Sequence, residues 1–222
     1  KDIKNVHLSV HPPTGRVSVS APLHINRETI RVYIISKLGW IKKQQLRIRE
    51  QERETPREYI DRESHYVWGK RYLLKVIEQE ARPLVSLQHN TLNLQVRSKA
   101  DKVKKAAVIA EWYREHVKEV AIQQIEKWEL VLGVQVEQLF IQHMKTRWGS
   151  CNPNAGNIRL NSELAKKPPQ CLEYILVHEM VHLLEPTHNA RFITIMDRNM
   201  PNWQSHRDTL NRLPVRYEWW RY

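Results

Sequence analysis

The segment from Cys171 to Leu184 is almost wholly apolar. A run of this composition predicts a helix that is buried on nearly all sides. His178, Glu179 and His182 lie inside it. Burying an unpaired imidazole or carboxylate in apolar surroundings is costly. The fold must therefore give these three side chains a partner that compensates for the lost water.

The spacing of the three polar residues indicates what that partner is. His178 and His182 are four residues apart, so on a helix their imidazoles stand on the same face, one turn apart. In zinc hydrolases with an H-E-x-x-H helix, two such rings bind one metal ion and the glutamate takes a proton from the water that the metal activates. We therefore predict a metal site with Glu179 as the catalytic base.

A third ligand has to come from beyond the helix, because further residues on the same face lie too far along its axis. Pro186 disfavours helical geometry at Glu185, so the chain is expected to turn there and bring His188 to the ion. Three histidines leave one tetrahedral position for water, which is typical of a catalytic zinc site. Glu185 is the alternative, either as third ligand or as a hydrogen-bond partner of a ligand. The cofactor prediction is one Zn²⁺, with other divalent ions left open.

The two cysteines bear on both the metal and the compartment. Cys171 lies seven residues before His178, a rise of about 10 Å along a helix, so it is too distant to share the ion. Cys151 stays open as a fourth ligand, although a core position is the more common use of such a residue. Two cysteines without a C-x-x-C pair form no disulfide framework, which favours a reducing cytoplasm.

Charge and hydropathy limit the partners. The chain has 36 Lys and Arg against 24 Asp and Glu, a net charge of +12, which attracts nucleic acid, nucleotides and acidic proteins without selecting one of them. No apolar run approaches the roughly 18 residues that span a bilayer, so we expect no membrane partner. Residues 1–10 lack the charged start and apolar stretch of a secretion signal, which also favours a cytoplasmic protein.

The first hundred residues are patterned mainly as strands. Gly15 and Gly69 each separate two alternating segments and predict two hairpins, and short strands follow around 85–87 and 92–96. One helix, expected over residues 27–53, interrupts them. Its charged part, residues 42–54, is mixed in sign, which is more typical of a solvated face than of a polyanion-binding surface.

The rest of the chain predicts helices around a small sheet. Residues 102–132 have an apolar helical face that ends before Gly133, a candidate C-cap. Strands are expected over residues 134–140, 142–148 and 158–160, with a turn at 152–157, and the last third is helical. The fold class is therefore α+β, with an antiparallel β-rich amino-terminal half containing one long helix. The boundary is expected at residues 97–102, giving domains 1–100 and 101–222.

The alternation of residues 157–161 suggests a substrate-binding strand. If this strand is an edge beside the metal-binding helix, an extended peptide can pair with it through main-chain hydrogen bonds. An ordinary edge strand without substrate is the equal alternative. Asn157, Arg159 and Asn161 on this strand, and Arg147 before it, are the candidate substrate-binding residues, and the two arginines could bind anionic groups or stabilise an oxyanion. His143 is close enough in sequence to act near the site.

Several segments resemble one known family, the YgjP-like metallopeptidase-domain family. They are 146–151 (Thr-Arg-Trp-Gly-Ser-Cys), 156–161 (Gly-Asn-Ile-Arg-Leu-Asn) and the H-E-x-x-H at 178–182 with His188, and, similar to the family's amino-terminal half, 64–72 and the segment around Trp40-Ile41. The resemblance implies a zincin-like α+β half for residues 101–222, with His178, His182 and His188 as zinc ligands and Glu179 as base. It also implies that the Arg-Trp-Gly-Ser-Cys strand lines the cleft. By analogy, the same motifs resemble more distantly the SprT-like and Wss-type proteases, which share the three-histidine arrangement and act on proteins attached to DNA.

These observations predict a zinc-dependent hydrolase, in the first place a metallopeptidase acting on a protein or peptide substrate. The first alternative is a nucleoside triphosphate pyrophosphohydrolase, for example acting on UTP, because the resembled family has been associated with this reaction. Lys145, Arg147 and Arg159 would then bind phosphates. The second alternative is a nucleic-acid-binding module with structural zinc, which would have no need of Glu179.

Overall fold

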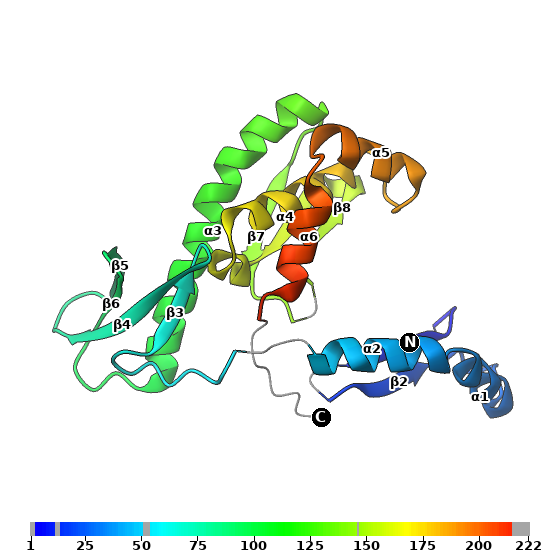
Figure 1. The fold of residues 1–222 in the computed structure, drawn as a ribbon, viewed down its shortest axis with the longest axis horizontal. Coiled ribbons are helices and arrows are strands. Elements are labelled where there is room, and N and C mark those ends of the chain that lie inside the picture. Colours follow the sequence, from blue (N-terminus) through cyan, green and yellow to red (C-terminus); the bar gives the residue numbers. More distant parts are fainter. Residues whose placement is uncertain (1–2, 12–13, 51–53, 146, 215–222) are drawn as a thin grey trace. The chain divides into compact units, whose positions relative to one another are not determined.

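The computed structural model describes residues 3–11, 14–50, 54–145 and 147–214. They form two compact units, the first from Lys1–Pro56 with Arg212–Tyr222 and the second from Arg57–Asn211. Both units contain strands and helices in separate runs along the chain, which confirms the α+β class (Figure 1). This division falls earlier in the chain than the boundary expected at 97–102, and the domains 1–100 and 101–222 stay a prediction.

The first unit consists of a hairpin and two helices. Strands β1 (His7–His11) and β2 (Arg16–Ser20) pair antiparallel, as expected from Gly15, whose φ of 76° few other residues adopt. The side-chain amide of Gln45 donates a hydrogen bond of 2.9 Å to the carbonyl of Gly15 and so ties the second helix to this turn.

The helix expected over residues 27–53 is in fact two helices. Helix α1 (Arg27–Ser36) begins at the N-cap Asn26, and α2 (Leu38–Glu50) follows after a single residue. Lys37 interrupts them because its backbone N–H bonds to the carbonyls of Ile34 and Ile35, which closes the first helix. The last residues of the expected helix, 51–53, lie outside the described part of the chain.

The second unit begins with a four-stranded sheet of order β3-β4-β6-β5. The strands are β3 (Ser64–Val67), β4 (Lys70–Glu78), β5 (Leu84–Gln88) and β6 (Thr91–Val96). The β3–β4 hairpin is antiparallel, as expected from Gly69, and the two strands expected next along the chain, β5 and β6, also pair antiparallel. The central pair β4–β6 is parallel, which the sequence pattern did not predict.

Helix α3 (Lys102–Leu132) joins this sheet to the rest of the unit. Asp101 caps its start by accepting from the N–H of Lys104, and Gly133 caps its end in the left-handed conformation, as expected. At about 1.5 Å per residue it is roughly 46 Å long. Its buried face, formed by Ile109, Tyr113, Val117, Ala121 and Trp128, packs along both sheets and along α4 (Pro169–Val181) (Figure 1).

A three-stranded sheet of order β7-β9-β8 follows, built from β7 (Gln138–Gln142), β8 (Gly149–Asn152) and β9 (Asn157–Asn161). The 3₁₀ turn η1 (Pro153–Ala155) connects β8 to β9. The expectation that residues 157–161 form an edge strand is wrong, because β9 pairs parallel with β7 on one side and antiparallel with β8 on the other. Alternation reports a buried face and carries no information about a strand's neighbours.

The strand expected over residues 142–148 is also wrong. In the described part of this segment, β7 ends at Gln142 and the next strand begins at Gly149. The segment is held instead by the buried side chain of Asn161, whose amide donates to the carbonyls of Met144 and Arg147, each at 2.8 Å. A side chain thus replaces the hydrogen bonds that a partner strand would have supplied.

The carboxy-terminal part is helical, as expected. The 3₁₀ segment η2 (Ser162–Lys166) leads into α4 (Pro169–Val181), which is followed by α5 (Ala190–Asn199) and α6 (Trp203–Arg212). Helix α4 is buried almost all round, since nine of its side chains are buried: Cys171, Leu172, Tyr174, Ile175, Leu176, Val177, Glu179, Met180 and Val181. Among the described helices, none combines the length and apolar character needed to cross a membrane.

The β3–β4 hairpin is bonded to the segment that precedes α4. The N–H of Trp68 donates to the carbonyl of Ala165 at 2.7 Å, and the N–H of Gly69 donates to that of Lys166 at 3.3 Å. The hydroxyl of Tyr113 on α3 donates to the carbonyl of Tyr66 at 2.8 Å. These bonds join the four-stranded sheet to α3 and to the segment that leads into α4.

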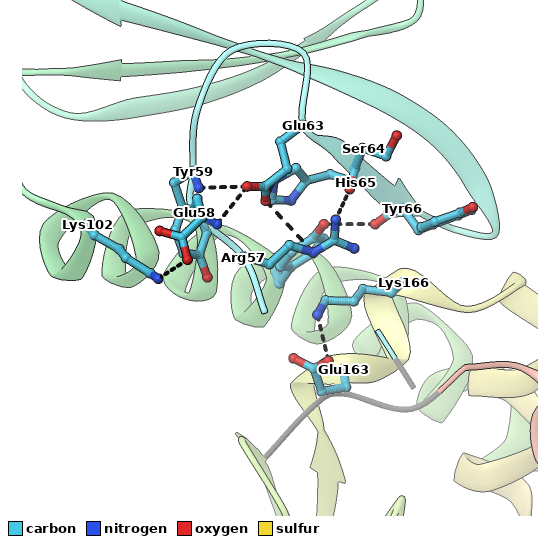
Figure 2. Close-up of polar contacts among 11 residues, drawn as sticks. Arg57, Glu58, Tyr59, Glu63, Ser64, His65, Tyr66, Lys102, Glu163 and Lys166 are labelled. Carbon is cyan, nitrogen blue, oxygen red and sulfur yellow. Dashed lines mark hydrogen bonds and ion pairs between the residues drawn. The ribbon is translucent and has the colours of Figure 1, made fainter. Parts of the chain in front are cut away.

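A buried histidine lies at the base of this hairpin. One carboxylate oxygen of Glu63 accepts hydrogen bonds from the N–H groups of Glu58 and Tyr59, at 2.7 and 2.8 Å, and the other lies 3.0 Å from Nε2 of His65 (Figure 2). His65 is only 3% exposed. Burial first, and then the charge of Arg57, lower the pKa of His65 to about 4, while Glu63 acts in the opposite direction.

This histidine predicts a loss of stability in mild acid. In the unfolded chain His65 has its ordinary pKa of 6.5, so between about pH 6.5 and 4 the unfolded state binds the extra proton. The contribution of His65 is present above pH 6.5 and falls by about 2 kcal/mol between pH 7 and pH 5. Urea unfolding of the wild type and of His65→Gln across this range measures it. Parallel pH profiles of the two proteins would contradict the prediction.

Candidate metal centre

Three histidines meet at the end of α4. His178 lies in the last turn of the helix, His182 is its C-cap, and His188 comes from the loop before α5. One ring nitrogen of each lies within 4.8 Å of the others, and among the described residues these three form the group of His, Cys, Asp or Glu side chains that could hold a metal ion. Nε2 of His178 and Nε2 of His188 are 2.9 Å apart. Two imidazole nitrogens that face each other at this distance need a proton or a cation between them.

The turn that brings His188 to the other two begins before Pro186. Helix α4 closes with hydrogen bonds from the N–H of Leu183 to Met180 and from the N–H of Glu185 to Val181, at 3.0 and 2.9 Å. Beyond the proline, the side chain of Asn189 caps α5 by accepting from the N–H of Phe192 at 3.0 Å. His188 is therefore fixed between the closed end of one helix and the capped start of the next.

Glu185 orients His182 through its backbone. Nδ1 of His182 lies 3.0 Å from the main-chain oxygen of Glu185. A carbonyl oxygen can only accept, so Nδ1 carries the proton and Nε2 keeps a lone pair for a metal ion. The carboxylate of Glu185 accepts a hydrogen bond from the hydroxyl of Thr187 at 3.0 Å. The alternative in which Glu185 forms a hydrogen bond with a metal-ligand residue agrees with this geometry, with the main-chain oxygen of Glu185 as the acceptor. The carboxylate of Glu185 is not part of the group of three histidines.

The imidazoles of the helix are held in the neutral form that binds metals. Burial, and then the neighbouring His182 and His188, lower the pKa of His178 to about 4. Burial also lowers the pKa of His182, against the opposing effect of its bond to Glu185. Neutral nitrogen ligands suit zinc and several other divalent metals. The donor set and its protonation therefore fit the ion that the sequence predicts.

Phe192 supports all three rings. Its ring centroid lies 5.0 Å from that of His178 and 4.8 Å from those of His182 and His188, and the side chain is 1% exposed. Sequence reasoning missed this residue. The only signal in the sequence is that Phe192 follows Asn189, the N-cap of α5, by three residues, which places it in the first turn of that helix. A rigid aromatic wall limits the rotamers that the imidazoles can adopt.

Glu179 lies against the start of β8. Its side chain is buried, and burial raises the pKa of Glu179 to about 7, while the positive charge of Arg147 acts in the opposite direction. A Cβ atom placed on Gly149 would lie 2.7 Å from Oε1 of Glu179. Only glycine lets the strand pass this close to the carboxylate. Sequence reasoning missed the contact, although a glycine within a strand is a known sign of close approach.

The structure separates the four candidate substrate-binding residues. Arg147 is exposed and near enough to Glu179 to affect its pKa. The guanidinium of Arg159 lies 5.1 Å from the ring centroid of Phe140. Asn157 is half-buried at the start of β9, and Asn161 is buried with its side chain bonded to the loop that carries Arg147. The substrate-binding roles stay predictions, and Asn161 has in addition a clear structural task.

The two cysteines are free thiols that stand apart from the three histidines. Burial raises the pKa of Cys151 to about 11, and the charge of Glu179 adds to the effect. Burial likewise raises the pKa of Cys171 to about 11. Neither thiol belongs to the group of three histidines, so the structure does not bring Cys151 in as a fourth ligand. His143 is exposed at the start of the loop after β7.

Helix α4 and its histidines place the chain among proteins that carry a metal-binding H-E-x-x-H helix. The family model described as YgjP-like, metallopeptidase domain, matches residues 4–213, so the chain belongs to the YgjP-like metallopeptidase family. This match confirms the resemblance that the motifs indicate, and it makes the chain a hydrolase of the metallopeptidase type.

Two solved structures are similar over a smaller part of the chain. One is the metallopeptidase zymogen abylysin of Pyrococcus abyssi, 21% identical, covering 42% of this chain and 90% of its own, with a TM-score of 0.37. The other is the metallopeptidase zymogen jannalysin of Methanocaldococcus jannaschii, 17% identical, covering 42% and 86%, with a TM-score of 0.34. No curated protein matches the chain.

Proposed function

We propose that the protein is a zinc-dependent peptidase in which His178, His182 and His188 hold one Zn²⁺ and Glu179 is the general base. The observation that carries the proposal is the convergence of three ring nitrogens within 4.8 Å, next to a buried carboxylate on the same helix. When bound, zinc supplies a Lewis acid that polarises a carbonyl group and lowers the pKa of water.

Glu179 performs the proton transfers. A carboxylate with a pKa near 7 is deprotonated in part of the population at neutral pH and can also return the proton, which is the balance that general acid–base catalysis requires. It takes a proton from the attacking water and delivers it to the amine that leaves. Arg147 is exposed, and its positive charge is near enough to act on the pKa of Glu179, so it is suited to stabilise negative charge on the carbonyl oxygen.

Strand β8 is the element best suited to bind an extended peptide. Within the described residues it pairs only with β9, so its other edge has main-chain groups available for a further strand. Its first residue, Gly149, touches Glu179. A peptide that pairs with this edge would therefore pass the carboxylate of Glu179. The sequence pattern had suggested that residues 157–161, the strand β9, pair with the peptide.

A metal-removal experiment with two substrate classes tests the proposal. Chelation followed by dialysis should abolish cleavage of a disordered protein substrate, and one equivalent of Zn²⁺ should restore it. A panel of nucleoside triphosphates that includes UTP, assayed for phosphate and pyrophosphate release, should stay unhydrolysed. The measurements are peptide products by mass spectrometry and bound zinc by elemental analysis.

The same experiment decides between the proposal and its two alternatives. Release of pyrophosphate without peptide cleavage would replace the peptidase by the nucleotide hydrolase. Bound zinc with no turnover of either substrate would favour the nucleic-acid-binding module with structural zinc. The family match supports the peptide substrate and gives no support to either alternative.

A further inference from the structure

The first unit has a surface that the metal site does not use. Residues 1–56 contain eleven Lys and Arg against five Asp and Glu, although the unit holds none of the three clustered histidines. Many of these cations are exposed on α2 and at its start, among them Lys37, Lys42, Lys43 and Arg49. A partner of this surface is therefore expected to be anionic.

One of these cations, Lys37, lines a groove. It is lined by Leu8 of β1, Tyr33 of α1, Lys37 between the two helices and Trp40 of α2, and its volume is about 250 Å³. This is somewhat below the roughly 300–1,000 Å³ of pockets for drug-sized ligands, so it suits a single ring system. Trp40 is 44% exposed, an unusual position for a large aromatic side chain with no assigned task.

The cations are arranged on both sides of the aromatic ring. Lys37 precedes Trp40 by three residues and lines the same groove, with its ammonium 5.9 Å from the ring centroid of Tyr33. Lys43 follows Trp40 by three residues on α2, a spacing that places both side chains on the same side of a helix. The order along this surface is therefore cation, aromatic ring, cation.

We propose that this groove binds an unstacked base of a single-stranded nucleic acid, with Lys37 and Lys43 contacting the phosphates on either side. Single strands present bases that can stack on exposed aromatic rings, while lysines follow the backbone. In a duplex the bases stack on one another and cannot stack on Trp40. An acidic peptide has the negative charge but no base that could stack on this side chain. The proposal is independent of the zinc site, because every residue named lies in the first unit.

Binding of a fluorescein-labelled twelve-residue oligothymidine to the full-length protein, followed by anisotropy, tests the proposal. Trp40→Ala should weaken binding about 5- to 150-fold, the equivalent of one lost stacking contact, and Trp40→Phe should keep most of the affinity. Lys37→Gln should reduce the slope of log affinity against log salt by about 0.7, the value for one phosphate contact on a single strand.

Three controls keep the result specific. Lys118→Gln removes an exposed cation from α3, and Leu130→Ala removes an apolar side chain that is 87% exposed, and both should bind like the wild type. Glu179→Gln should also bind like the wild type, which separates this site from the proposed peptidase activity. Circular dichroism checks that each variant is folded.

Four outcomes would overturn the proposal. Equal affinity of wild type and a folded Trp40→Ala shows that no base stacks in the groove, and an unchanged salt slope in Lys37→Gln shows that this lysine meets no phosphate. Competition by a duplex as effective as by the single strand points to a backbone contact alone. Trp40-dependent binding to phosphatidylserine vesicles in place of the oligonucleotide assigns the surface to a membrane.

Discussion

Replacing Glu179 by glutamine is expected to lower the rate of peptide hydrolysis by about 10²–10⁴-fold while zinc remains bound. The amide has nearly the shape of the carboxylate, so the packing of α4 is kept. It has no basic oxygen that could take a proton from water, so the chemical step is lost. The readouts are kcat on a disordered protein substrate and zinc content per chain.

A second glutamate on α4 provides the matched control. The carboxylate of Glu173 accepts hydrogen bonds from Lys127 and Trp128, at 3.0 and 3.1 Å, and takes no part in the histidine group. Glu173→Gln keeps an oxygen acceptor and should leave kcat unchanged. Full activity of a zinc-loaded Glu179→Gln protein would mean that the base is another residue and that the proposed mechanism is wrong.

Gly149→Ala is expected to cost about 10²-fold in kcat/KM without removing any group that performs chemistry. The new Cβ would lie 2.7 Å from Oε1 of Glu179, 2.8 Å from its Cγ and 2.9 Å from Cγ2 of Ile175. Atoms cannot stay that close, so either the carboxylate or the strand must move. We also expect a loss of about 1–3 kcal/mol in the free energy of unfolding, typical of overpacking.

Gly39→Ala is the control for the loss of glycine itself. Nothing lies within 4 Å of a Cβ at Gly39, which is inside α2, so alanine should stabilise the helix by about 0.5–1 kcal/mol. A double variant gives the sharper test. If Gly149→Ala acts by displacing the carboxylate, it should lower activity little further in a Glu179→Gln background. Wild-type activity of Gly149→Ala would refute the steric argument.

The metal centre was largely predictable because its determinants are local in the sequence. The H-E-x-x-H spacing fixes two imidazoles on one helix face, and Pro186 with Asn189 limits where the next residues can go. Helix α3 was predicted from Lys102 to Leu132 for a similar reason, since its apolar periodicity and the C-cap Gly133 are both local in the sequence.

The parts that failed depend on partners distant in the sequence. The central position of β9 depends on β7 and β8, and alternation within residues 157–161 contains nothing about either. The segment before β8 looked like a strand because its apolar residues alternate, yet the side chain of Asn161 bonds its backbone instead. The contacts of Gly149 and Phe192 with the site likewise arise only after α4 packs against β8 and α5.

The hydrogen bonds from the N–H groups of Trp68 and Gly69 to the carbonyls of Ala165 and Lys166 connect the four-stranded sheet to the segment before α4. The sheet therefore helps to hold the helix that carries the candidate metal site. The segment that these bonds anchor ends three residues before Pro169, where the helix with both H-E-x-x-H imidazoles starts. A descendant that lost this sheet would have to replace two backbone donors to keep the helix in place. Residues 57–101 are thus a part of the support of α4, and not a separate appendage.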